Sequence, residues 1–479
     1  MPEASDDILD QLERFLAAQP DVAAPPRIER LERVGVGRSR ENWLFDAVWP
    51  DGTVEPLIVR RDPRGGLLET SRAAEFAVLR ALEATAVPAP RVRWLDADGS
   101  LLGRPSLVMV REPGEVDYFV VNGDRPLAER VDLAQRFCDL LATLHAADWA
   151  AAGLGAVLSD PGPKAARAEL DGWTAILRRD QQEPWPELEV ARRWLAATAP
   201  RSGRTVLVHG DFKAGNVLLE GGDRLVALLD WELAHLGDPM EDLGWITQPL
   251  RLREHLIPGV WGREDLFARY QAATGTPVDP ESVAWWNVLA SYKTAVMQVS
   301  GLRSFREGRS DEPYRPTAAV LRALLDAVAP PSEAEPANAG PVGAGAADDH
   351  IVSQHLAGAR RLLEQVAADP GLSPAGAAAV ADARRLVRQA ATAWPDALAF
   401  LVDDNRQLAE LLTALGSGPE VGIDDGSAAA SAVGPAHRRN LELRGRLADA
   451  ADQLDAAQVA TVARALRHRL DRDPANRRS

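Results

Sequence analysis

The chain has 479 residues, 46% of them hydrophobic, which exceeds one ordinary core and predicts two or three domains. Its formal net charge of -16 argues against a protein whose main task is to bind nucleic acid or an anionic membrane surface. Cys138 is the only cysteine, which excludes an internal disulfide framework and a thiolate zinc cluster. The sequence has no apolar stretch of bilayer length, and its acidic N-terminus lacks a secretory signal, so we expect a cytoplasmic protein.

Short β-type segments separated by turns occupy the first part of the chain. After an N-terminal helical extension over residues 1–27, two strands around a glycine-containing turn are predicted for residues 28–48. Further strands are predicted for residues 54–60, 91–95 and 106–110. Between them, a helix over residues 71–84 carries Glu75 on the same stripe as two leucines, so this carboxylate is expected to face inward. These elements predict a small antiparallel sheet with one helix.

A larger helical region follows a break at residues 112–114. Residues 330–347 are rich in Pro, Gly, Ala and Glu, a composition typical of a flexible linker. Residues 348–479 predict four or five amphipathic helices without a recognisable catalytic motif. We interpret them as a module for homodimer formation or for binding a protein partner.

Polar loop residues follow short apolar strands in the middle of the chain. In VLVHGDFKAGNVLL, residues 206–219, Asp211 and Asn216 share one loop between two apolar strands. A third apolar strand over residues 225–229 runs directly into Asp230. Loops at strand ends are where protein scaffolds often carry reactive groups. One carboxylate can accept a proton from a substrate hydroxyl, while amide and carboxylate oxygens can bind a divalent cation such as Mg²⁺.

His-Gly-Asp, four further residues and Asn, then Asp-Trp-Glu after a hydrophobic strand, resemble the aminoglycoside phosphotransferase and choline kinase superfamily, distant relatives of the protein kinases. The resemblance covers about residues 28–325. It implies a two-lobed α+β protein-kinase-like fold and the cofactors ATP and Mg²⁺. It also implies that Asp211 is the catalytic base, that Asn216 and Asp230 bind the metal, and that His209 is a structural residue of the loop.

The same resemblance predicts the domain boundaries. Residues 28–112 would form the small antiparallel-sheet lobe that covers the nucleotide. Residues 113–329 would form the larger helical lobe that carries the catalytic residues and binds the acceptor, a small molecule with a hydroxyl group. Residues 348–479 would form a separate all-α domain after the linker.

The family also has nucleotide contacts upstream of the catalytic loop. Gly35 and Gly37 lie at the position of its nucleotide-covering loop, where glycine lets backbone amides approach phosphate. The following strand ends in two arginines where the family has a lysine paired with a glutamate. Arg60 best occupies the lysine position and Glu75 the glutamate position, with Arg61 as the alternative partner.

Two further segments have counterparts in the family. Residues 106–114 resemble the linker between the lobes, where backbone groups near Val110 and Arg111 would hydrogen-bond the adenine edge. In HLGDPMED, residues 235–242, several acidic side chains and His235 suggest a metal site. Similar segments in the family stabilise the loop and a helix start, and Asp238 before a proline suits a helix N-terminus. We therefore expect a structural role for residues 235–242.

Likeness to one branch of the family narrows the range of possible acceptors. Residues 60–82 resemble the branch fused to acyl-CoA dehydrogenases, which is linked to phosphorylation of hydroxyacyl-CoA or hydroxy acids. An aminoglycoside or amino-alcohol acceptor is the alternative, since the average charge of the chain does not describe a local pocket. In the helix over residues 285–305, Lys293, Gln298 and Arg303 are candidates to meet an anionic acceptor, although the expectation for Lys293 and Arg303 is a solvated position.

Two other functions are compatible with parts of the sequence. A catalytically silent pseudokinase is favoured by Arg60 in place of lysine, whereas the presence of the expected base and both metal ligands argues against it. A metal-dependent hydrolase would require His209 and His235 to converge on a transition metal together with Asp211 and Asp230.

Overall fold

The computed structural model describes residues 3–34, 41–62, 70–310, 313–330, 351–368, 371–417 and 433–476. Contacts within the chain divide it into two compact units. The first unit contains residues 1–179 and 198–315, and the second contains residues 180–197 and 316–479. Among the described residues, no helix is long and apolar enough to cross a membrane.

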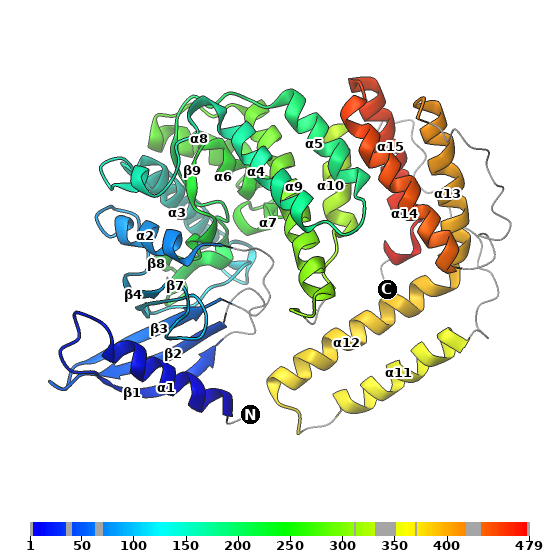
Figure 1. Cartoon of the computed structure of the whole chain (residues 1–479). Helices are drawn as coiled ribbons and strands as arrows, with labels where there is room; N and C mark the ends of the chain where they lie inside the picture. Colours follow the sequence, from blue (N-terminus) through cyan, green and yellow to red (C-terminus); the bar gives the residue numbers. More distant parts are fainter. Residues whose placement is uncertain are drawn as a thin grey trace. The chain divides into compact units, whose positions relative to one another are not determined.

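A five-stranded antiparallel sheet forms the N-terminal part of the first unit (Figure 1). In the spatial order β1-β2-β3-β5-β4, its strands are β1 (Arg27–Val34), β2 (Glu41–Val48), β3 (Val54–Arg61), β5 (Ser106–Val110) and β4 (Val92–Asp96). Leu57 and Val59 of β3 share one face of the sheet, because side chains alternate along a strand. Helix α1 (Glu3–Ala17) packs Leu12 and Phe15 into the same core cluster.

Helix α2 (Arg72–Leu82) follows β3 and contacts strands β4 and β5. It begins after Ser71, whose hydroxyl accepts a hydrogen bond from Ala74 N at 3.2 Å and so caps the first turn. Val78 and Leu82 are buried on its inner face together with Glu75. The predicted inward orientation of Glu75 is therefore observed.

The remainder of the first unit is mainly helical. Its longer helices are α3 (Leu127–Ala146), α4 (Ala165–Asp180), α6 (Met240–Thr247), α8 (Arg263–Thr274) and α9 (Pro280–Arg306), and α7 (Leu252–His255) is a single turn. Helices α6 and α9 approach closely at Gly244, where an added Cβ would lie 2.4 Å from Trp286 Cβ. The predicted α+β class is confirmed, because an antiparallel sheet is followed by a helical lobe and then by further helices.

Two short antiparallel sheets interrupt this helical part. Strand β6 (Val206–Val208) pairs with β9 (His235–Gly237), and β7 (Val217–Glu220) pairs with β8 (Arg224–Leu228). The loop between β6 and β7 includes the 3₁₀ turn η4 (Ala214–Asn216). The loop between β8 and β9 includes η5 (Trp231–Leu233). The predicted strand-loop-strand arrangement of this region is thus present.

The second unit consists of helices. They are α5 (Pro186–Thr198), α10 (Ala318–Val328), α11 (Ile351–Ala367), α12 (Pro374–Ala393), α13 (Ala397–Ala414), α14 (Val433–Ala450) and α15 (Ala456–Arg472). Apart from residue 330, the expected linker at residues 330–347 lies outside the described residues. Residues 180–197, which include most of α5, group with the C-terminal helices although they come from the middle of the chain.

Buried charges explain why α5 belongs to this unit. Glu187 of α5 is fully buried, and its carboxylate oxygens lie 3.9 Å from Arg444 Nη2 and 3.6 Å from Arg469 Nη1. Asp404 of α13 accepts hydrogen bonds from Arg469 Nε at 2.8 Å and from Asn440 Nδ2 at 2.7 Å. A buried carboxylate needs such partners, since an isolated charge is costly in the protein interior. The partners of Glu187 come from α14 and α15.

Candidate active site

The loop between β6 and β7 is held in place by α6. Asp242 Oδ2 accepts a hydrogen bond from His209 N at 2.8 Å, and its Oδ1 accepts one from Gly210 N at 3.0 Å. His145 Nε2 lies 3.2 Å from Asp242 Oδ2. Burial alone would raise the pKa of Asp242, but the hydrogen bond and charge of His145, with further contributions from His209, hold it below its usual value. A charged carboxylate thus fixes the backbone just before Asp211.

His209 is engaged within the loop through both ring nitrogens. Its Nε2 lies 2.9 Å from Leu229 O, and its Nδ1 accepts a hydrogen bond from Asp211 N at 3.2 Å. This pattern assigns the ring proton to Nε2. Burial lowers the pKa of His209, which favours the neutral ring. Neither nitrogen is left for a transition metal, which argues against the hydrolase alternative.

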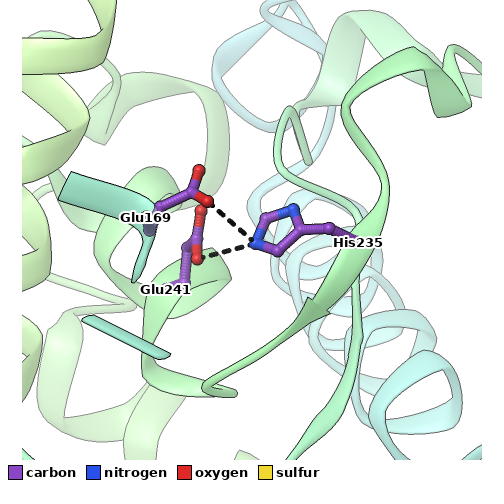
Figure 2. A group of neighbouring side chains, drawn as sticks. All are labelled: Glu169, His235 and Glu241. Atoms are coloured by element: carbon purple, nitrogen blue, oxygen red, sulfur yellow. Dashed lines mark hydrogen bonds and ion pairs between the residues drawn. The ribbon is translucent and has the colours of Figure 1, made fainter. Parts of the chain in front are cut away.

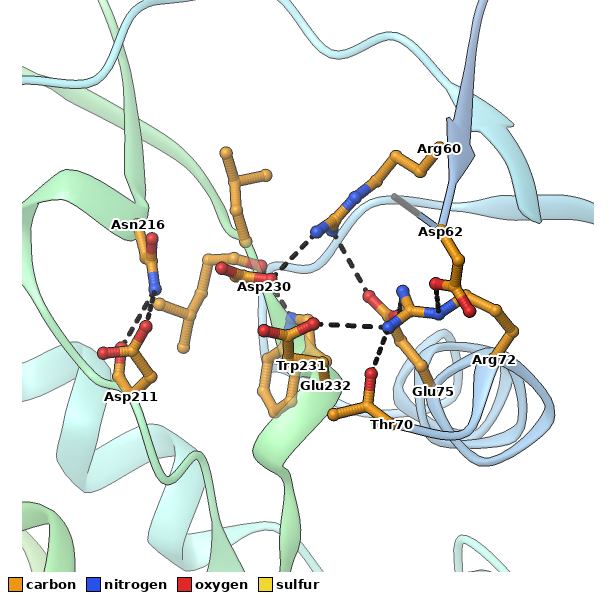
Figure 3. Close-up of polar contacts among 12 residues, drawn as sticks. Arg60, Asp62, Thr70, Arg72, Glu75, Asp211, Asn216, Asp230, Trp231 and Glu232 are labelled. Carbon is orange, nitrogen blue, oxygen red and sulfur yellow. Dashed lines mark hydrogen bonds and ion pairs between the residues drawn. The ribbon is translucent and has the colours of Figure 1, made fainter. Parts of the chain in front are cut away.

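Asp211 lies beside Asn216, to which it is joined by hydrogen bonds (Figure 3). Its Oδ2 accepts a hydrogen bond from Asn216 Nδ2 at 3.2 Å and forms an ion pair with Lys213 Nζ. Its Oδ1 is buried and has no hydrogen-bond partner among the described residues. Burial would lower the pKa of Lys213, but the charge of Asp211 outweighs it and raises this pKa. Lys213 is not among the residues predicted for the site, although its position two residues after Asp211 in the polar loop is a usable signal.

The loop after β8 lies beside Asn216. Leu229 N donates a hydrogen bond to Asn216 O at 2.7 Å, which brings the next residue, Asp230, close to the Asn216 side chain. Asp230 has a left-handed backbone with φ 69° and ψ 61°, a conformation that residues other than glycine seldom adopt and that is concentrated at functional sites. An amide oxygen and a carboxylate are hard ligands of the kind that Mg²⁺ prefers. The donor set therefore fits the predicted metal.

Arg60 joins the sheet to this loop. Its Nη1 donates a hydrogen bond to Glu75 Oε1 at 3.3 Å, and its Nη2 donates one to Asp230 Oδ1 at 2.8 Å (Figure 3). Burial alone would lower the pKa of Arg60, but the charges of Glu75 and Asp230 outweigh it. Arg61 instead donates a hydrogen bond to Gln11 Oε1 at 3.1 Å, on the α1 face of the sheet. Adjacent residues of a strand point to opposite faces, so only Arg60 reaches Glu75.

A second arginine, Arg72, shares the Glu75 carboxylate. It is buried, forms an ion pair with Glu75, and lies 3.2 Å from Glu232 Oε2 through Nη2 and 3.0 Å from Asp62 Oδ1 through Nε. Arg72 and Glu232 are not among the residues predicted for the site. Arg72 could have been found from its position three residues before Glu75, because residues at this spacing share a helix face.

The backbone at Val110 and Arg111 was predicted to contact the adenine edge of the nucleotide. Val110 N donates a hydrogen bond to Arg91 O, and Arg111 N donates one to Pro56 O, each at 2.9 Å. These two N–H groups therefore already have backbone partners within the chain. Proline has no N–H, so Pro56 cannot donate a hydrogen bond to the Arg111 carbonyl in return. That carbonyl is therefore the better candidate for a contact with the adenine edge. Gly35 and Gly37 lie outside the described residues.

A compensated ion cluster connects α4, β9, α6 and α9 (Figure 2). Lys293 Nζ lies 3.0 Å from Glu169 Oε1 and 2.7 Å from Glu241 Oε1. His235 Nε2 lies 3.1 Å from Glu241 Oε2 and 3.6 Å from Glu169 Oε2. The expectation of a solvated Lys293 is wrong, since its side chain is only 2% exposed. Two carboxylates from distant parts of the sequence lie next to this ammonium group and offset the cost of burying it.

The charge state of this cluster argues against a metal at this position. One ligand atom from each of Glu169, His235 and Glu241 lies within 4.8 Å of the others, a spacing that could suit a metal ion. Burial alone would lower the pKa of His235, but Glu169 and Glu241 outweigh it and raise this pKa to about 10. A metal would have to displace that proton and approach Lys293. The four residues are therefore better described as a neutral set of two anions and two cations.

The fold and the arrangement of these loops define a kinase-like phosphotransferase. Residues 30–286 match the model of the phosphotransferase enzyme family (APH), which is more than half of the chain. The chain belongs to this family, whose members are small-molecule phosphotransferases.

Curated relatives include acyl-CoA dehydrogenase family members. The chain is 32% identical to family member 10 of Mus musculus over 194 residues, which cover 40% of this chain and 18% of the mouse protein. It is 29% identical to family member 11 of Rattus norvegicus over 198 residues, which cover 40% of this chain and 25% of the rat protein. The chain thus spans a quarter or less of these two relatives.

Solved structures support the fold. A protein of Ralstonia eutropha JMP134 described as an aminoglycoside phosphotransferase superposes with a TM-score of 0.50 and 23% identity. The match covers 66% of this chain and 94% of the Ralstonia chain. It shows a shared architecture.

Proposed function

We propose that the chain transfers the γ-phosphate of ATP to a hydroxyl group of a hydroxyacyl-CoA or a free hydroxy acid, with Asp211 as the catalytic base. The proposal rests on one observation: the two oxygens of the Asp211 carboxylate differ in whether they have a partner. Oδ2 is occupied by Asn216 and Lys213, whereas Oδ1 is buried and has no partner among the described residues. A buried polar atom without a partner is rare, so Oδ1 is the oxygen available to accept a substrate proton.

Asn216 and Asp230 would hold Mg²⁺, which neutralises charge on the nucleotide phosphates during transfer. Arg60 already lies against Asp230, and its planar guanidinium can donate to phosphate oxygens as well. Glu75 supports Arg60 through the adjacent Nη1. We assign the Arg111 carbonyl to the adenine edge, and Gly35 with Gly37 to the phosphates.

Lys213 has a separate role in this scheme. Its ammonium group pairs with Asp211 Oδ2 and so helps to fix the orientation of the carboxylate, with Oδ1 left for the acceptor. The same charge can offset negative charge that develops on the transferred phosphoryl group. Asp242 keeps the loop backbone in place through two hydrogen bonds.

The proposed acceptor class is supported by local charge. A polycationic aminoglycoside calls for acidic side chains that lack a partner. Here Glu169 and Glu241 are each shared between Lys293 and His235, so this cluster offers no excess negative charge. The names of the curated relatives also point to acyl-CoA chemistry.

The test is ADP release with magnesium-ATP across hydroxyacyl-CoAs, hydroxy acids, amino alcohols and aminoglycosides. Asp211→Asn should lower acceptor-dependent turnover by about 10²-fold or more, because it removes the base while keeping the shape of the side chain. Asp223→Asn, at an exposed residue of the β7–β8 turn, is the matched control and should keep full activity. Transfer only to amino alcohols or aminoglycosides would overturn the acceptor class, and ATP binding without any transfer would favour a pseudokinase.

A further inference from the structure

An arginine with unused donors lies between α6 and α7. The guanidinium of Arg251 stacks on the Trp245 indole, with Cζ 4.8 Å from the ring centroid, and Nη1 donates a hydrogen bond to Glu254 Oε1 at 3.1 Å. The side chain is 23% exposed. Within the described part of the chain, its Nε and Nη2 have no hydrogen-bond partner. The planar guanidinium is held by the Trp245 indole and by Glu254, so its remaining N–H donors have a defined direction. Such a group suits a carboxylate or phosphate ligand.

Contacts of α7 locate Arg251 beside the catalytic loop. His255, four residues after Arg251, packs against Phe212 with ring centroids 5.8 Å apart, and Phe212 directly follows Asp211. Burial is the main cause that raises the pKa of Glu254, and the charge of Asp211 adds to it. The pair of Arg251 and Glu254 is therefore near the proposed base.

The same region contains buried polar atoms that lack partners among the described residues. Besides Asp211 Oδ1, they are Trp245 Nε1, Gln248 Oε1, Glu254 Oε2 and His255 Nε2. Trp245 is only 2% exposed, and it carries an unpaired donor on the ring that Arg251 covers. Because buried polar groups are normally satisfied, this concentration of donors and acceptors indicates the place of a polar ligand.

We propose that Arg251 binds an oxyanion of the phosphate acceptor while the acceptor hydroxyl lies at Asp211. The inference rests on the proposed function and assigns a residue that selects the acceptor. The oxyanion is either the carboxylate of a hydroxy acid or a phosphate of a CoA ester, since both accept two hydrogen bonds from an arginine fork. The acceptor therefore carries a negative charge within reach of α7.

Kinetics with charged and neutral acceptors test this assignment. Arg251→Gln should raise the KM for 3-hydroxybutyrate or 3-hydroxybutyryl-CoA by about tenfold or more, because a hydrogen bond to a charged group is lost. The KM for the neutral 3-hydroxybutyramide should stay the same, and Arg251→Lys should restore part of the affinity for the anions. Arg253→Gln, at an exposed position of α7, is the matched control. An equal loss for charged and neutral acceptors would mean that Arg251 only supports the fold.

Chemical protection gives a readout that does not require turnover. Phenylglyoxal modifies accessible arginines, and peptide mapping can follow Arg251 and Arg253 separately. Either 3-hydroxybutyrate or 3-hydroxybutyryl-CoA should slow modification of Arg251 and leave Arg253 unaffected. Protection by the free acid identifies the oxyanion as a carboxylate, and protection by the CoA ester alone identifies it as a phosphate. Lack of protection by both anions would overturn the inference even if phosphate transfer is observed. Protection without transfer would instead count against the proposed reaction.

Discussion

Arg60 Nη2 lies 2.8 Å from Asp230 Oδ1, so a cation from the sheet neutralises the carboxylate near the start of the loop after β8. The same guanidinium also contacts Glu75, 3.3 Å away through Nη1. One side chain thus links strand β3, helix α2 and the proposed metal ligand. A lysine has a single nitrogen for these contacts, whereas arginine divides them between two.

The first prediction concerns Arg60. Arg60→Gln should weaken magnesium-ATP binding by about tenfold or more, because Glu75 and Asp230 lose their common partner and the nucleotide loses a charged donor. Calorimetric titration measures this change. Arg61→Gln is the matched control, since Arg61 contacts Gln11 on the opposite face. Equal losses in both variants would show that Arg60 has no special part in nucleotide binding.

The second prediction concerns the metal. Asp230→Asn should keep the fold, because asparagine tolerates the left-handed backbone at φ 69°. It should remove most of the magnesium dependence of ATP binding, since a neutral amide is a weaker ligand than a carboxylate. The measurement is ATP affinity with Mg²⁺ and with a chelator, for the variant and for Asp223→Asn. If the ratio of the two affinities is unchanged in Asp230→Asn, this residue does not bind the metal.

The third prediction concerns the pH dependence of stability in the ion cluster. The pKa of His235 is raised from 6.5 to about 10, so its contribution is complete below the unfolded-state value and is lost as the pH rises through about 10. The contribution of Glu169 to stability depends on pH in the opposite direction. Burial would raise its pKa, but His235 and Lys293 lower it to about 2, so its contribution is lost as the pH falls toward that value.

Denaturant unfolding at several pH values measures this effect. The free energy of unfolding of the unmodified chain should fall as the pH rises above 6.5 toward about 10. His235→Gln removes the titrating group and should flatten that part of the profile. A variant with the same slope as the unmodified chain would show that His235 is not protonated in the cluster.

The fourth prediction concerns domain organisation. We propose that α5 folds with the C-terminal helices, because Glu187 is buried against Arg444 and Arg469. Glu187→Gln should lower the free energy of unfolding by about 3 kcal/mol, since it removes the buried negative charge that faces Arg444 and Arg469. Glu442→Gln, whose side chain is 57% exposed, should change it by less than about 0.5 kcal/mol. A chain cut after residue 329 that keeps full stability and activity would contradict this organisation.

The sequence predicted most of the elements that surround the site, because their signals are local. The strand at Ser106–Val110 and the helix near Arg72–Leu82 follow from the spacing of apolar residues. The loops around Asp211 and Asp230 were predicted in the same way, from polar residues at the ends of short apolar segments. Their roles as base and metal ligand remain predictions that the variants above test.

Other features could not be predicted because they depend on residues that are distant in the sequence. Lys293 meets Glu169 and Glu241, which are 124 and 52 residues away, and no local pattern distinguishes it from a solvated helix lysine. The sequence predicted that backbone groups near Val110 and Arg111 contact the adenine edge, but it did not show that the N–H groups of these two residues are already engaged within the chain. Pairing with Arg91 and Pro56 depends on strand order, which the spacing of residues does not specify.

By itself, the sequence determined the family, the order of the reactive loops and the α+β class, because short motifs and apolar periodicity persist in the linear chain. Only the tertiary structure decided that Arg60 rather than Arg61 meets Glu75, that Lys293 is buried, and that residues 180–197 join the C-terminal helices. The physical reason is that burial and ion pairing are properties of a site assembled from distant segments. The free energy of a buried charge depends on partners that the chain brings together only when it folds.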